Sequence, residues 1–419
     1  MEHNSQKNYT SAVIILGALF FIFGFVTWLN GTLIPYLKIA CELKGIQPYF
    51  VAFAFYISYF FTAIPNSFIL QRTGYRKGMM TGLLMMAVGA LIFIPAAHNR
   101  SFGIFLTGLF VIGTGLSLLQ TASNPYITIV GPIESAASRI SIMGICNKIA
   151  GTLAPIILGM VILNDADALT ESLKSLDDFA RTAKLDELAG RVIMPYSIMA
   201  AVLAGLAMMI QFLKLPEIDF ESENQHVDES ASTKTNVFQF PQLVFGVIAL
   251  FLYVGVEVIA GDTIGLYGQH QGIALSVAKN FTAYTLTAMI VGYIIGIFTI
   301  PKIIRQDIAL AISAVIGIIF SAVVMLTSGY TSVMFVALMG LANALMWPAI
   351  WPLAIEGLGR FTKTASALLI MAIAGGATLP LLYGYMSDEN RLGSQNAYAI
   401  MIPCYAFILW YALSGHKKR

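Results

Sequence analysis

The sequence predicts an all-α membrane protein with twelve transmembrane helices in two pseudo-symmetric six-helix bundles. Apolar runs of transmembrane length recur along the chain, charged residues are scarce, and one long polar segment divides the runs six and six. A run of ~20 residues rising 1.5 Å each spans a ~30 Å hydrocarbon core. The predicted helices are Ser11–Leu37, Phe50–Leu70, Gly78–Ala97, Phe102–Tyr126, Ser141–Leu163, Met194–Leu215, Phe240–Tyr267, Asn280–Ile300, Ile308–Leu326, Ser332–Ile355, Ala365–Tyr385 and Tyr398–Leu413.

Composition excludes several other classes of protein. Charged residues make up 11% of the 419 positions, against ~25% in a soluble domain. The net charge of +2 comes without the clustered basic residues of a nucleic-acid-binding protein. Neither the three cysteines nor the five histidines have the spacing of a metal or catalytic site. We therefore expect no enzyme, cofactor or metal, no nucleic-acid partner, and a monomer in the lipid bilayer.

Lysine and arginine residues sort to one side of the predicted membrane. The joints after the second, fourth, eighth and tenth helices are basic, as is the end of the chain: Arg72, Arg76, Lys77, Arg139, Lys302, Arg305, Arg360, Lys363, Lys417, Lys418 and Arg419. The positive-inside rule makes this side cytoplasmic, with both termini on it, in a bacterial inner membrane. The longer joint Asn164–Arg191 is predicted to form two short amphipathic helices on the outer surface.

Domain boundaries follow from the polar segments. Residues 217–237 are acidic and poor in large apolar side chains, which is typical of a flexible linker. The predicted organisation is a cytoplasmic N-terminus (1–10), a first bundle (11–216), this linker, a second bundle (238–414) and a basic tail (415–419). The N-terminus has no cleavage site, so we expect the first helix to be retained. Two such halves predict a binding cavity at the midplane.

The fourth predicted helix carries two amides on one face. Gln120 and Asn124 are four residues apart, and Pro125 opens the helix beside them. Two amides offer donors and acceptors that suit a neutral polyhydroxy solute. The alternative is that they hydrogen-bond neighbouring helices.

Charged residues interrupt the fifth and seventh predicted helices. Asn147 and Lys148 lie ~15 Å into the fifth helix, near the midplane, where a charge is costly and usually functional. Glu257 lies deep in the seventh helix and would serve as a proton carrier, a cation ligand or the partner of Lys148. Asp262 is a further coupling candidate, or else it caps a broken helix at the surface. A purely structural ion pair is the alternative for Lys148.

The tenth predicted helix combines an amide with two indoles. Asn343, Trp347 and Trp351 recur at intervals of four residues, beside two prolines. Indole faces stack on the C–H faces of sugar rings while the amide holds hydroxyls, so this set suits a hexose. The alternative for a membrane tryptophan is the interfacial belt. Asn30, next to Trp28 in the first helix, is a similar candidate.

Over its whole length the chain resembles the fucose–galactose–glucose symporter family of the major facilitator superfamily. The resemblance rests on NGTLIPYLK (Asn30–Lys38), LQTASNPYI (Leu119–Ile127), YVGVEV (Tyr253–Val258), ANALMWPAIWPLAIEGLGRFTK (Ala342–Lys363) and GGATLPLLYGYMSD (Gly375–Asp388). Gln120, where fucose permeases have an acidic residue, points to the glucose/galactose branch. The resemblance implies alternating access around a hexose at the midplane, driven by H⁺ or Na⁺.

Two departures from the family pattern bear on coupling. The family usually has Asp after Asn30, with a role in coupling, whereas this chain has Gly31. It usually has a small polar residue where Lys148 stands. Our hypothesis is that the Lys148 ammonium takes the electrostatic role of a coupling cation, so that transport is proton-coupled through Lys148 or Glu257, or uncoupled. Sodium coupling, a lipid or drug carrier on the same fold, and a non-transporting sugar sensor are the alternatives.

Overall fold

A computed structural model describes residues 2–129, 136–212, 234–300 and 303–418, without the side chains of residues 2–13, 71, 124–129, 136–141, 212, 360 and 363. Every regular element in these ranges is a helix. Twelve helical segments among the described residues are long and apolar enough to cross a bilayer, which confirms the predicted fold class and a multi-pass membrane protein. Most of the predicted linker, residues 217–233, lies outside the described residues.

The first half of the chain forms one set of helices. It comprises α1 (Glu2–Trp28), α2 (Asn30–Ala40), η1 (Gln47–Tyr49), α3 (Phe50–His98), α4 (Phe102–Ile129), α5 (Ala136–Ile162), α6 (Ala166–Ser175), α7 (Asp178–Gly190) and α8 (Ile193–Phe212). The predicted pair of short helices in the Asn164–Arg191 joint is thus confirmed as α6 and α7. The predicted second and third helices form the single element α3, which turns at Gly74 with a φ of 76°. This left-handed backbone conformation is one that glycine adopts readily.

The second half of the chain forms the other set of helices. It comprises η5 (Val237–Gln239), α10 (Pro241–Asp262), α11 (Ile264–His270), α12 (Leu275–Ala278), α13 (Phe281–Thr299), α14 (Gln306–Leu326), α15 (Gly329–Asn343), α16 (Met346–Ile355), η6 (Gly359–Phe361), α17 (Thr362–Met371), η7 (Ala372–Ala374), α18 (Gly375–Met386), α19 (Gly393–Asn396), η8 (Ala397–Ile400), α20 (Met401–Leu413) and η9 (Gly415–Lys417).

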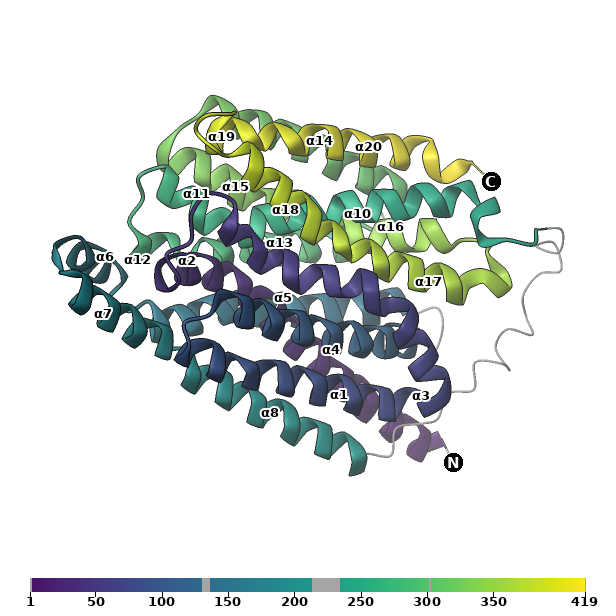
Figure 1. Ribbon diagram of the computed structural model, residues 1–419. Coiled ribbons are helices and arrows are strands. Elements are labelled where there is room, and N and C mark those ends of the chain that lie inside the picture. The colour runs from purple at the N-terminus through teal and green to yellow at the C-terminus, as the bar shows by residue number, and fades with distance from the viewer. Residues whose placement is uncertain (1, 130–135, 213–233, 301–302, 419) are drawn as a thin grey trace.

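The two sets lie side by side as two bundles with their long helices roughly aligned (Figure 1). The first described turn of α1 and the end of η9 lie at one end of the molecule, which we call the terminal end. Helices α6 and α7 project from the opposite end, the α6–α7 end (Figure 1). The shared end of the two termini agrees with an even number of membrane crossings.

Several predicted helices are broken where their backbone hydrogen bonding is interrupted. The seventh predicted helix divides at Thr263 into α10 and α11, and the Thr263 hydroxyl donates to the Ile259 carbonyl at 2.7 Å. Such back-bonding competes with the helical ladder. The tenth divides between α15 and α16, because Pro348 has no N–H to donate one turn back. The first divides after Trp28. The breaks fall beside candidate site residues.

Glycine allows two very close helix contacts, one in each bundle. A Cβ at Gly24 of α1 would lie 1.8 Å from the Asn147 carbonyl oxygen of α5. A Cβ at Gly375 of α18 would lie 1.8 Å from the Phe251 carbonyl oxygen of α10. Small residues let membrane helices approach this closely. Equivalent helices are therefore in close contact in the two bundles. These are α1 and α5, the first and fifth transmembrane segments, and α10 and α18, the seventh and eleventh.

Candidate functional site

A buried ion pair joins the two bundles. The Lys148 Nζ atom of α5 lies 2.8 Å from the Glu257 Oε1 atom of α10, and their side chains are only 9% and 10% exposed. An isolated charge at this depth would be costly, whereas each of these charges compensates the other. Of the three roles open to Glu257 from sequence, partnership with Lys148 is the one shown by a direct contact.

Trp28 completes the environment of this pair. The Lys148 Nζ atom lies 4.5 Å from the centroid of the buried indole ring, a cation–π contact. The ring fits between α5 and α10 because both helices have glycine beside it. A Cβ at Gly151 or at Gly261 would come within 2.4 or 2.3 Å of indole atoms. The ammonium is therefore held by a carboxylate of the second bundle and an indole of the first.

A second carboxyl group lies buried between the bundles. Asp262, at the end of α10, is fully buried, so the alternative of a helix cap at the surface is wrong. The Tyr56 hydroxyl of α3 donates to the Asp262 Oδ2 atom at 3.4 Å. Oδ1 has no hydrogen-bond partner among the described residues, and neither has the amide nitrogen of buried Asn30. These groups have unused hydrogen-bonding capacity in a closed interior.

Contacts near the α6–α7 end hold the bundles together there. The hydroxyls of Tyr49 and Ser387 lie 3.5 Å apart across the two bundles. The ammonium of Lys279, which follows α12, donates to the Leu163 carbonyl at 2.6 Å and to the Gly159 carbonyl at 3.3 Å. The backbone N–H of Ser276 donates to Asp167 in α6. The molecule is therefore closed at this end.

The two tryptophans of the tenth transmembrane segment stack on each other. The rings of Trp347 and Trp351 lie 5.4 Å apart at 25°, and both side chains are half-buried. Tyr253 of α10 lies 6.5 Å from Trp347. Asn343 is fully buried, and its Oδ1 atom accepts a 2.9 Å hydrogen bond from Tyr405 of α20. The amide oxygen of Asn343 is thus engaged within the second bundle, away from the first.

The amides predicted in the first bundle are not brought into one cluster by any described contact. Gln120 is half-buried on α4, and the Asn124 side chain lies outside the described residues. The Asn147 amide donates to the Phe20 carbonyl of α1 at 3.4 Å. This contact matches the alternative of helix-to-helix bonding for Asn147. The role of these amides in binding stays a prediction.

Cavities at the surface involve other residues. A cavity of about 520 Å³ at the terminal end of the second bundle is lined by Arg305, Gln306, Asp307, Leu353, Glu356, His416 and Lys417. An apolar groove of about 450 Å³ lies along α14 and α20. Neither includes a predicted substrate residue. Within the described ranges, no three His, Cys, Asp or Glu side chains are grouped as metal ligands.

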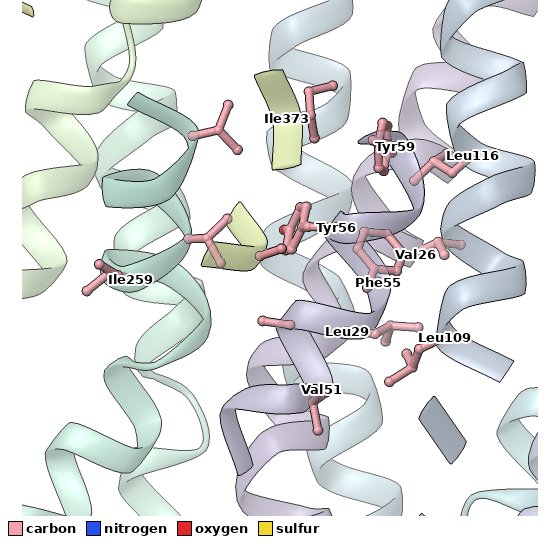
Figure 2. Packing of buried hydrophobic residues seen from close by; sticks show 14 of the residues in the cluster. Val26, Leu29, Val51, Phe55, Tyr56, Tyr59, Leu109, Leu116, Ile259 and Ile373 are labelled. Carbon is pink, nitrogen blue, oxygen red and sulfur yellow. The ribbon is translucent and has the colours of Figure 1, made fainter. Parts of the chain in front are cut away.

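Tyr56 is the site residue that sequence reasoning missed. It lies in the aromatic run FYISYF, where its hydroxyl is the only sign that it differs from the phenylalanines. Figure 2 shows its side chain reaching from α3 toward the ribbon that carries Ile259. It also packs against α18, since a Cβ at Gly376 would lie 3.0 Å from its ring. A buried tyrosine hydroxyl usually finds a polar partner, and here that partner is Asp262.

Comparison with known proteins places the chain in a family. Residues 16–381 match the model of the Major Facilitator Superfamily. The chain is 35% identical to the glucose/galactose transporter of Brucella abortus over 100% of its own length and 97% of that protein. It is 32% identical to the putative glucose/galactose transporter of Helicobacter pylori, over 99% and 98% of the two chains.

Solved structures agree with the sequence match. A crystal structure of the Escherichia coli fucose:proton symporter superposes with a TM-score of 0.74 at 26% identity, covering 97% of this chain and 98% of that one. A D-xylose-proton symporter, at 14% identity and a TM-score of 0.69 over 98% and 99% of the two chains, shares the fold. The chain belongs to the major facilitator superfamily. Within it, the chain falls in the fucose–galactose–glucose symporter family, in the glucose/galactose branch.

Proposed function

We propose that this protein is a secondary active transporter that carries a hexose of the glucose/galactose type by alternating access. The names of its relatives support a sugar as the substrate. The observation that carries the proposal is the buried Lys148–Glu257 pair, which joins the two bundles beside an indole. Alternating access needs contacts between the bundles that form in one state and break in another.

The remaining polar residues supply a binding surface for the hexose in this proposal. The stacked Trp347 and Trp351 present flat apolar faces to sugar C–H groups. Gln120, Asn124 and Asn30 offer amides to its hydroxyls, and Asn147 and Asn343 are the other two amides predicted to bind it. Because Asn147 and Asn343 already bond within their own bundles, we assign them to positioning the helices in this state. Gln120 and the two indoles are half-buried and therefore best placed to meet a solute.

Lys148 favours a proton over sodium as the coupling ion. Its ammonium already neutralises the Glu257 carboxylate at 2.8 Å, which is what a bound sodium ion would otherwise do. A permanent internal cation leaves no charge for sodium to compensate at this position. The same observation supports one second candidate, an uncoupled hexose uniporter. We place the protein in a bacterial inner membrane as a monomer, with the terminal end and both termini in the cytoplasm.

Transport in proteoliposomes tests this function. Radiolabelled glucose and galactose are offered to the reconstituted protein in counterflow, under an inward pH gradient, and under an inward sodium gradient. We expect counterflow, and accumulation with the pH gradient alone. Accumulation with sodium and no response to pH would reject the role given to Lys148. Counterflow without accumulation under either gradient would identify the uniporter, and no counterflow with any hexose would overturn sugar transport.

A further inference from the structure

We propose that Asp262 is the group that carries the coupled proton, and that Lys148 and Glu257 remain a charged pair throughout. This inference rests on the proposed proton-coupled transport and names the residue responsible. The two carboxyl groups lie on one helix, α10, five positions apart. Their surroundings differ in a way that separates their roles.

Glu257 has a strong cationic partner and Asp262 has none in contact. The Glu257 carboxylate is 2.8 Å from the Lys148 ammonium, so its ionised form is compensated. Asp262 is fully buried, and the hydrogen bond that its Oδ2 atom accepts from Tyr56 is long at 3.4 Å. Its other oxygen has no partner in the described part of the chain. Burying an unpaired carboxylate is far more costly than burying the neutral acid, so Asp262 carries a proton in this closed state.

The groups around Asp262 do not restore the ionised form. The charges that act on it are Glu257, which repels a second negative charge, and Lys148, which is committed to Glu257. The titratable group that faces it from α3 is Tyr56. From α13, the neutral hydroxyls of Thr282 and Thr285 bond to the carbonyls of Gly261 and Ala260, the two residues before Asp262. None of these neighbours is a cation paired directly with the Asp262 carboxyl group.

A sodium ion fits this place less well than a proton. Sodium would need several oxygen ligands besides the carboxylate, usually backbone carbonyls at a helix break. The carbonyls nearest to Asp262 in sequence already accept hydrogen bonds. Thr285 donates to the Ala260 carbonyl at 2.9 Å and Thr282 to the Gly261 carbonyl at 2.7 Å. The Ile259 carbonyl accepts from Thr263. A proton needs only the carboxyl group itself.

The position of Asp262 links its proton to the movement of the bundles. Tyr56 belongs to the first bundle and Asp262 to the second, and Figure 2 shows Tyr56 extending across their boundary. When the α6–α7 end opens, the two separate and water reaches the carboxyl group. When the contacts of Tyr49, Ser387 and Lys279 close this end again, that water is excluded. Asp262 must therefore take up a proton from the solution at the α6–α7 end before closure. Water that later enters from the terminal end takes the proton, so one positive charge moves with each neutral hexose.

The test compares Asp262→Asn with Asp388→Asn, a matched change in the exposed loop before α19. Proteoliposomes report glucose counterflow, glucose accumulation under an inward pH gradient, and alkalinisation of a weakly buffered medium on adding glucose. We expect Asp262→Asn to keep counterflow, to lose accumulation, and to give no alkalinisation, because the amide mimics the neutral acid. Asp388→Asn behaves as wild type. Accumulation retained in Asp262→Asn overturns the assignment.

A second variant separates the two carboxyl groups. In the double variant Lys148→Gln, Glu257→Gln, we expect the alkalinisation measured per glucose transported to persist, even where the transport rate falls. Its loss, with counterflow intact, would assign the proton to Lys148 or Glu257 and overturn the proposal for Asp262.

An infrared measurement needs no sugar and stands apart from the proposed function. The detergent-solubilised wild type near neutral pH should show a protonated-carboxyl band that is missing from Asp262→Asn and present in Asp388→Asn. No difference between the spectra overturns the assignment, whatever the protein transports. If the band is present but no hexose gives counterflow, the proposed substrate has failed while the proton on Asp262 stands.

Discussion

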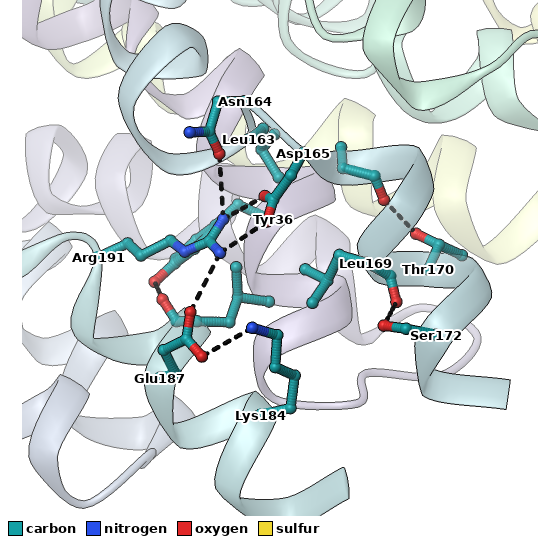
Figure 3. A network of polar contacts seen from close by, with 12 residues as sticks. Tyr36, Leu163, Asn164, Asp165, Leu169, Thr170, Ser172, Lys184, Glu187 and Arg191 are labelled. Atoms are coloured by element: carbon teal, nitrogen blue, oxygen red, sulfur yellow. Dashed lines mark hydrogen bonds and ion pairs between the residues drawn. The ribbon is translucent and has the colours of Figure 1, made fainter. Parts of the chain in front are cut away.

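Two groups of charged side chains lie in contrasting surroundings, one between the bundles and one at the α6–α7 end. At the α6–α7 end, Arg191 contacts Asp165 through two hydrogen bonds and Glu187 at 3.4 Å, as Figure 3 shows. These groups all belong to the first bundle, and the Asp165 side chain is 42% exposed. The Lys148–Glu257 pair is buried and spans both bundles. The comparison teaches that ion pairs serve two purposes here. The Arg191 contacts hold the first bundle together internally, whereas the Lys148–Glu257 pair joins the two bundles to each other.

Breaking the buried pair should give the largest effect on stability. Glu257→Gln leaves the Lys148 ammonium buried beside a neutral amide, which typically costs ~3–5 kcal/mol. We expect a large fall in the Tm of the detergent-solubilised protein. Removing both charges in Lys148→Met, Glu257→Gln should recover much of the loss. A double-mutant cycle measures this coupling, and simple additivity of the two single changes would contradict a direct interaction.

Filling the space beside the indole should have the next largest effect. Gly261→Ala places a Cβ 2.3 Å from the Trp28 ring, so α10 and the indole must move apart. Overpacking of this kind costs ~1–3 kcal/mol. We expect a lower Tm and slower counterflow. The control is Gly205→Ala on α8, where a Cβ would meet nothing within 4 Å. Equal effects of the two changes would show that Trp28 is not tightly held.

Removing a contact that closes the α6–α7 end should change the balance of conformations more than stability. Lys279→Met deletes a donor to the Leu163 and Gly159 carbonyls across the bundles. Hydrogen bonds from charged groups contribute ~1.5–3 kcal/mol. We expect a cysteine introduced at Ser387 to become more reactive toward a water-soluble thiol reagent. Exposed Lys174→Met serves as the control, and unchanged reactivity in Lys279→Met would mean that this contact does not hold the end closed.

Breaking the contact between Arg191 and Asp165 at the α6–α7 end should have the smallest effect on stability, and this effect should depend on pH. The hydrogen bond from Arg191 lowers the pKa of Asp165 below its usual range. A lowered pKa contributes stability above the unfolded value of ~3.9, and this stability is lost as the pH falls through the folded value. Asp165→Asn should therefore lower the free energy of unfolding near pH 7 by ~1 kcal/mol or less, as for other exposed pairs, and lower the Tm slightly. The difference should vanish in strong acid, and a difference that persists there would exclude this origin.

The sequence was sufficient for the helices but less so for their contacts. Twelve apolar runs and one polar divider predict the fold, because a bilayer admits few other solutions. The positions of Lys148 and Glu257 deep within apolar helices predict a functional role for both, but the sequence leaves three roles open for Glu257, of which partnership with Lys148 is one. Burial of Asp262 could not be read from sequence, because it depends on α3 and α13 packing over the end of α10. The same holds for Tyr56, whose partner lies 206 positions away.

The matched glycine contacts of α1 with α5 and of α10 with α18 have a mechanical consequence. Backbones that touch without intervening side chains cannot slide or tilt against each other without collision. Each bundle is thereby stiffened where these two helices meet. In the proposed transport cycle, movement would therefore occur mainly at the interface between the two bundles, where the Lys148–Glu257 and Tyr56–Asp262 contacts would break and form again.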